Sequence, residues 1–310
     1  MEVSLDRLCE LFGFTRQTLN YHSRAVQLRA MEEEAIVNEV RYLRGILPRC
    51  GGRKLYVLLQ RQGYEIGRDR LFEVLRRNGL LVPRRHYRIV TTYTYSWMRK
   101  YPNLIKDLVI NRPDQAWVSD ITYIQVKEPS GPKTMYLSLV TDAFTHEIVG
   151  HALHDTLDTE GPLRALQMAL NGRDESSIHG LIHHSDRGCQ YCSAEYVGVL
   201  KAHGIDISMT SKGDPYENAI AERLNGILKT EWLYNETLTS VDMAQKRIDE
   251  IVFAYNNGRP HMSIGNLTPV EARSRAAELP KKLWKNYWLE KRSREGGDAS
   301  HSRQLADALP

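Results

Sequence analysis

The stretch AWVSDITYIQV, residues 116–126, alternates apolar and polar side chains, which is the pattern of a β-strand with one buried face. Residues 129–132 read as a turn, and MYLSLVT, residues 135–141, predicts a second strand. Residues 146–152 predict a third, so the three would form a meander. Asp120 stands in the middle of the first strand among apolar neighbours.

Helices and strands are expected to alternate after this meander. In chain order they are a helix at 163–170, a short buried strand at 181–184, a helix at 194–202, a strand at 205–209, and long helices at 218–234 and 241–255. Three strands followed by this alternation predict an α/β domain with a mixed sheet covered by helices on both faces.

The first part of the chain predicts helices only. Residues 5–12 have apolar side chains at helical spacing, Gly13 ends that helix, and Thr15 can cap a second one. This is the outline of a helix-turn-helix. Separate short helices are then expected at 34–47, from residue 54, and at 69–77, with arginines on their polar faces. Such a small bundle suits DNA binding.

Charge separates the chain into unlike parts. The formal net charge is +4, yet residues 41–100 alone hold fifteen Arg or Lys and three Asp or Glu, a net of +12. A block this long and nearly single-signed favours a polyanionic partner. No apolar run approaches the roughly 20 residues of a membrane span. With no signal peptide and only four cysteines, a reducing cytoplasm is expected.

Three acids stand where a metal site would form. Asp120 is mid-strand, Asp186 follows the strand 181–184 at its carboxyl end, and Glu222 lies on the helix that begins near Asn218. Carboxylates converging from two strands and a helix suit hard divalent cations, usually Mg²⁺. Each acid alone is commonplace, and a strand Asp more often bonds a loop. Lys229, seven residues after Glu222, lies on the same helical face.

Other candidate sites are weaker. Cys189 and Cys192, with two histidines just before them, suggest zinc, but no second ligand pair has suitable spacing, so packing is the favoured role. Asp142 is expected in a turn or cap. Arg259 and His261 are expected to stabilise the fold or touch DNA rather than act as acid and base.

Several motifs in order resemble one family, the OrfB-type transposases of the insertion sequence 3 family, whose catalytic domain is similar to retroviral integrase and ribonuclease H. The resemblance covers about residues 35 to 275. Glu217 and residues 223–225 depart from the pattern, which bears on substrate preference. The matching stretches are residues 117–123, 184–191, 211–219, Glu222, 255–261 and 268–272.

The resemblance implies a ribonuclease H-like fold and a catalytic, metal-binding triad of Asp120, Asp186 and Glu222. It implies two Mg²⁺ ions, with Mn²⁺ as a substitute, where Asp120 would bridge the ions. It also brings Lys229 near the DNA, and places Lys212 and Asn218 toward substrate. The basic front half adds further candidate DNA-binding residues: Arg53, Lys54, Arg70, Arg84 and Arg85.

The implied activity is metal-dependent cleavage at transposon ends and strand transfer into target DNA. Double-stranded DNA, a homo-oligomer on DNA and an upstream-frame companion protein are the implied partners. The alternatives are a metal-dependent nuclease of the same fold and a DNA-binding regulator with an inactive core. The expected organisation is a helix-turn-helix-like segment at 1–30, a basic helical DNA-binding domain at 35–82, a basic linker at 83–108, a catalytic domain at 109–275 and a tail at 276–310.

Overall fold

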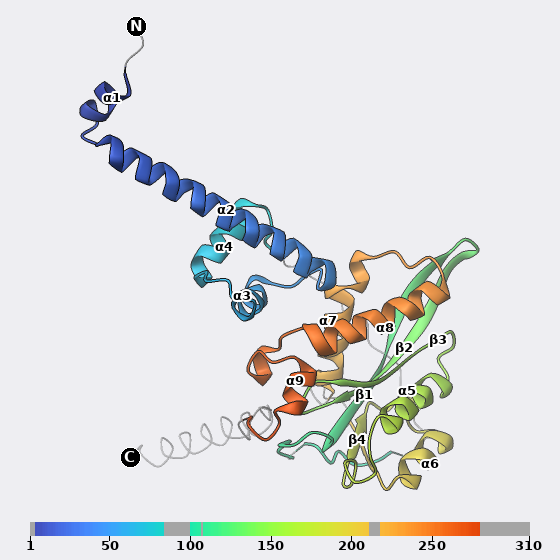
Figure 1. Cartoon of the computed structure of the whole chain (residues 1–310). Coiled ribbons are helices and arrows are strands. Elements are labelled where there is room, and N and C mark those ends of the chain that lie inside the picture. Colours follow the sequence, from blue (N-terminus) through green and yellow to red (C-terminus); the bar gives the residue numbers. More distant parts are fainter. Residues whose placement is uncertain (1–3, 84–99, 107, 211–217, 280–310) are drawn as a thin grey trace, which may run out of the picture. The chain divides into compact units, whose positions relative to one another are not determined.

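A computed structural model describes residues 4–83, 100–106, 108–210 and 218–279. The chain divides into two compact units, residues 1–85 and 86–310. The first is helical, and the second holds a sheet with helices around it (Figure 1). Within the described ranges, no helix has the length and apolarity that crossing a membrane requires.

The first unit opens with a helical hairpin. Helix α1, Leu5–Leu11, is capped by the Ser4 hydroxyl, which accepts a hydrogen bond from the Arg7 amide at 3.4 Å. Gly13 has a φ of +71°, a value that suits glycine, and reverses the chain. Thr15 then caps helix α2 by accepting from the amide of Thr18 at 3.1 Å. The predicted break and cap are confirmed.

Helix α2 is longer than the sequence suggested. It runs without interruption over Arg16–Ile46, so the separate helix expected at 34–47 is the second half of one 31-residue helix. The expectation of two helices was wrong because residues 31–34 lack an apolar period. A polar stretch does not end a helix, however, and residues 16–44 contain neither glycine nor proline.

A small core forms where the second half of α2 meets two short helices. These are α3, Gly52–Arg61, and α4, Arg68–Arg77. The side chains packed between them are fully or almost fully buried. They include Val40, Leu43, Leu55, Leu59, Leu71 and Leu75.

The second unit is built on a five-stranded mixed sheet in the order β3-β2-β1-β4-β5. Strands β1, β2 and β3 are antiparallel, whereas β4 and β5 run parallel to β1. This is the ribonuclease H-like arrangement, and it confirms the predicted fold class. The strands are β1 Ala116–Glu128, β2 Gly131–Asp142, β3 Ile148–His154, β4 Ile182–Ser185 and β5 Asp206–Met209.

Helices cover both faces of this sheet (Figure 1). Successive side chains of β1 point to opposite faces of the sheet. Trp117 packs in the core with residues of α5 and α6, whereas Val118 packs with Ala221 of α7. The remaining helices follow along the chain. They are α5 Glu160–Asn171, α6 Ala194–Ala202, α7 Ala219–Glu231, η1 Leu233–Asn235, α8 Val241–Gly258, η2 Met262–Ile264 and α9 Pro269–Ser274.

An ion-pair cluster ties α9 to the loops at one end of the sheet. The Arg273 guanidinium donates to both carboxylate oxygens of Asp114, at 2.6 and 3.1 Å, and also to Glu147. Arg173 contacts the same two acids. Asp142 is fully buried and its Oδ1 accepts from the Thr145 amide at 2.7 Å in the turn that follows β2, so its predicted turn role is confirmed.

Gly150 lets α5 lie against β3. A Cβ built at this position would come within 2.0 Å of the Ala165 backbone oxygen, which cannot move without shifting the helix. We expect Gly150→Ala to lower the free energy of unfolding by about 2–3 kcal/mol through overpacking. Chemical denaturation would measure this, with Gly198→Ala as the control. A Cβ at Gly198, inside α6, has nothing within 4 Å. Equal stability of the two variants would contradict the close approach.

Candidate active site

Two of the predicted acids lie side by side because of the sheet register. Strands β1 and β4 are parallel, and Ser119 is paired with Ser185. Asp120 directly follows Ser119 and Asp186 directly follows Ser185, so both acids stand where the β1–β4 ladder ends. The Asp186 carboxylate accepts from the Gly188 amide at 2.9 Å, which fixes its position in the loop after β4.

Glu222 reaches the same place from helix α7. Its amide donates to the Asn218 backbone oxygen at 3.1 Å in the first helical turn. The Asn218 side chain in turn donates to the Ser119 backbone oxygen at 3.4 Å, on β1 next to Asp120. The start of α7 is therefore tied directly to the strand that carries Asp120.

The electrostatics show that the three carboxylates converge. Burial, followed by the charge of Asp186, raises the pKa of Asp120 to about 7, and Glu222 adds to the effect. Burial also raises the pKa of Asp186. The pKa of Glu222 is raised by burial and by the charge of Asp186. The charge of Asp186 thus disfavours the ionised form of both other carboxylates, as expected for acids that share one site.

Asn225 is a site residue that sequence reasoning missed. Its amide nitrogen donates to Oδ2 of Asp120 at 2.7 Å, while its own Oδ1 is buried without a hydrogen-bond partner. Its spacing from Glu222, three residues along one helix, is the signal that could have found it. Lys229 lies on the same face, where burial lowers its pKa and the charge of Asp120 opposes that shift.

The predicted DNA-binding residues fall into three groups. Asn218 is only 6% exposed, so it holds α7 against β1, and its DNA contact stays a prediction. In the first unit, Arg53 is exposed on α3, Lys54 is partly buried and Arg70 pairs with Glu32 at 3.4 Å. The other three, Lys212, Arg84 and Arg85, lie outside the described residues.

The competing sites have structural explanations. None of the four cysteines forms a disulfide, and Cys192 contacts the Met209 sulfur at 3.8 Å, which agrees with a packing role. Arg259 is 5% exposed and makes a two-pronged ion pair with Glu231, at 2.7 and 2.8 Å. It also contacts the His261 ring. Arg259 and His261 thus stabilise the fold, one of the two roles predicted for them.

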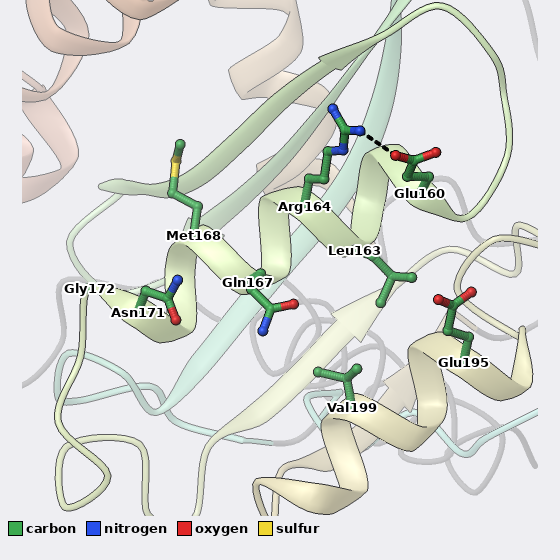
Figure 2. A pocket seen from close by; sticks show the side chains of 9 residues that line it. All are labelled: Glu160, Leu163, Arg164, Gln167, Met168, Asn171, Gly172, Glu195 and Val199. Carbon is green, nitrogen blue, oxygen red and sulfur yellow. Dashed lines mark hydrogen bonds and ion pairs between the residues drawn. The ribbon is translucent and has the colours of Figure 1, made fainter.

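A shallow groove lies away from the triad, between α5 and α6 (Figure 2). Its volume is ≈ 740 Å³, and Leu163 and Val199 line it from the two helices. Glu160, on its rim, also belongs to a group in which ligand atoms of His154, Asp158 and Glu160 lie within 4.8 Å of one another. Arg164 pairs with Glu160, so these acids have a cation beside them. None of the predicted site residues lines the groove.

Comparison with known proteins gives the class of this domain. Two family models, each described as an integrase core domain, match residues 110–215 and 203–269. The magnesium-bound catalytic core domain of HTLV-2 integrase is 18% identical with a TM-score of 0.40, over 52% of this chain and 96% of that one.

Relatives from insertion elements match most of the chain. An uncharacterized 31 kDa protein of insertion element IS600 from Shigella sonnei is 32% identical over 88% of this chain and 99% of its own length. Transposase InsF of insertion sequence IS3A from Escherichia coli K12 is 30% identical over 82% and 83%, respectively. The chain therefore belongs to the transposases of the insertion sequence 3 family, which are DDE-type polynucleotidyl transferases.

Proposed function

We propose that Asp120, Asp186 and Glu222 are the catalytic carboxylates of this transposase and that they hold two divalent cations, Mg²⁺ or in its place Mn²⁺. One observation carries the proposal. Three acids far apart in sequence meet at the end of the β1–β4 ladder, where the charge of Asp186 raises the pKa values of both Asp120 and Glu222. A structural cluster of acids would be expected to contain arginines, as the one around Arg273 does.

The residues present fit such cations. Hard divalent ions prefer carboxylate and amide oxygens, and this site offers three carboxylates. Two buried amide oxygens, Oδ1 of Asn218 and Oδ1 of Asn225, lack hydrogen-bond partners beside them. Deprotonated carboxylates would be stabilised there by a bound cation, because it supplies the opposite charge that the site lacks.

The proposed reaction has two steps. Water attacks a phosphodiester at the element's end, the P–O bond to the 3′ oxygen breaks, and a 3′ hydroxyl is released. That hydroxyl then attacks a target phosphodiester and displaces another 3′ oxygen, so bonds broken and formed balance. When bound, the two ions would activate the attacking oxygen and stabilise the leaving one. Lys229, partly buried near Asp120, is suited to hold a phosphate oxygen.

DNA binding is proposed to involve the helical unit as well. Exposed arginines such as Arg53 offer contacts to the phosphate backbone, which set affinity more than sequence choice. The two compact units agree with a separate DNA-binding part, although the finer boundaries at 30, 82, 108 and 275 stay predictions. A homo-oligomer on paired element ends and an upstream-frame companion belong to this proposal.

Replacing one carboxylate tests the function. Glu222→Gln keeps the shape of the side chain but removes its charge, so we expect strand transfer of labelled element ends with Mg²⁺ or Mn²⁺ to fall about 10³-fold. DNA binding, measured by gel shift, should be unchanged. Glu195→Gln, at an exposed position on α6, is the matched control and should keep full activity. Equal transfer by wild type and Glu222→Gln would overturn the proposal.

The same assay separates the two alternatives. A nuclease of this fold would release cut ends with Mg²⁺ and yield no joined products. A DNA-binding regulator with an inactive core would bind DNA in a salt-dependent way and neither cut nor join. The repelling, cation-poor carboxylate site argues against the regulator, because an inactive core would gain stability by losing these charges.

A further inference from the structure

Behind the triad, on the opposite face of the sheet, lies a buried group of polar side chains that the mechanism does not use. The Nε2 atom of His183 is 2.8 Å from the Ser119 hydroxyl and 2.9 Å from the Tyr196 hydroxyl. All three side chains are at most 1% exposed. They come from β4, β1 and α6, respectively, so one ring nitrogen joins three elements.

The protonation of this group follows from its contacts. Burial, with a smaller effect from His184, lowers the pKa of His183 to about 3, so the ring is neutral at physiological pH. A neutral ring nitrogen makes one strong hydrogen bond at a time, and the Ser119 and Tyr196 hydroxyls both lie within hydrogen-bond distance of Nε2.

The group is also fixed by aromatic packing. The Tyr191 ring lies 6.2 Å from the His183 ring and 5.3 Å from the Tyr196 ring, in tilted and edge-to-face arrangements. Tyr191 belongs to the loop that follows Asp186. The loop that carries one carboxylate is therefore packed against the same histidine that holds Ser119.

Two members of the group stand close in sequence to a proposed metal-binding residue. Ser119 directly precedes Asp120, and His183 lies three residues before Asp186 on a strand of four. Strand pleating sends Ser119 to the face opposite Asp120, so its hydroxyl can anchor the backbone without occupying the metal site. Asn218 holds the Ser119 backbone oxygen from the α7 side.

We propose that Ser119, His183 and Tyr196 form a hydrogen-bonded positioning unit that fixes the separation of Asp120 and Asp186 for cation binding. The proposal rests on the metal-binding triad proposed above. Two strands that pair over only four residues, 116–119 with 182–185, can shift at the end of their ladder. The contact between the Ser119 hydroxyl and Nε2 of His183 opposes that shift, because it joins the two strands that carry the carboxylates.

A double-mutant cycle tests the unit. Tyr196→Phe and Ser119→Ala each leave Nε2 one hydroxyl partner, whereas the double variant leaves it neither of them. We expect the Kd for Mn²⁺, measured by calorimetry without DNA, to rise about threefold in each single variant. It should rise about thirtyfold or more in the double variant, beyond the roughly ninefold product of two independent effects and within the range for changes behind metal ligands. Strand transfer lost by the variants should return at high Mn²⁺.

Matched variants separate positioning from stability. Tyr255→Phe removes the hydroxyl of an equally buried tyrosine on α8, and it should leave the Mn²⁺ Kd unchanged. If both tyrosine variants lose stability but neither changes the Kd for Mn²⁺, the positioning role is overturned. The single Tyr196→Phe variant is enough for this decision if the double variant does not fold. If instead the proposed metal-binding triad is wrong, Asp186→Asn will have the same Kd for Mn²⁺ as the wild type.

Discussion

Asp120→Asn is expected to abolish strand transfer, by about 10³-fold or more, while making the metal-free protein more stable at neutral pH. Activity is lost because a neutral amide cannot supply the charge that holds the cations. Stability rises because burial and the charge of Asp186 make the ionised Asp120 unfavourable, with a pKa of about 7 against an ordinary 3.8. The Asn225 bond to this side chain can be kept by the new amide oxygen.

The stability gained by Asp120→Asn should depend on pH. Between pH 3.8 and 7 the folded protein holds a proton on Asp120 that the unfolded chain has lost, so wild-type stability falls as pH rises through this range. The gain from Asp120→Asn should therefore be small near pH 4, grow toward pH 7 and then level off. Thermal unfolding in EDTA would measure it, with Asp206→Asn, an exposed acid on β5, as the control. A gain that does not vary with pH would contradict the assignment.

Arg273→Ala is expected to cost the largest amount of stability, about 3–5 kcal/mol. The guanidinium neutralises Asp114 and Glu147 at once, and it lies 4.0 Å from the fully buried Asp142. Removing it leaves buried carboxylates without their main partner, and such broken pairs are strongly destabilising. Because Arg273 stands on α9 and the acids stand at the sheet, the helix should also detach more readily.

Denaturant unfolding and hydrogen exchange across residues 269–274 would measure both effects. Arg164→Ala is the matched control, since it breaks an exposed ion pair with Glu160 and should change stability by less than about 1 kcal/mol. If Arg273→Ala cost no more than Arg164→Ala, the ion-pair cluster would not be a significant contributor to the fold.

Much of the catalytic unit was predictable because its strands follow simple periods. The alternation over residues 116–126 and 135–141 found β1 and β2, and short apolar runs found β4 and β5. Register then brings Asp120 and Asp186 together without further information, since each directly follows one of the paired serines. Glu222 was picked out by its place on the predicted helix, and the resemblance then implied its catalytic role.

The remaining features depend on contacts between distant residues. Nothing near Arg273 in sequence indicates that it meets Asp114, 159 residues away. The His183 unit is likewise hidden, because a histidine in a short apolar strand reads as one more buried residue. Asn225 belonged to a departure from the family pattern that was assigned to substrate preference, and only its bond to Asp120 places it in the site.

Because α2 is continuous, its length sets the direction in which the α1 hairpin faces around the helix axis. A straight helix turns about 100° with each residue, so the hairpin formed with α1 faces a direction fixed by the number of residues before the bundle. One residue inserted near position 32 would rotate the hairpin by about 100°, whereas seven would return it nearly to its starting azimuth, about 10 Å farther out. Only insertions close to a whole number of helical turns would therefore keep the direction of the hairpin.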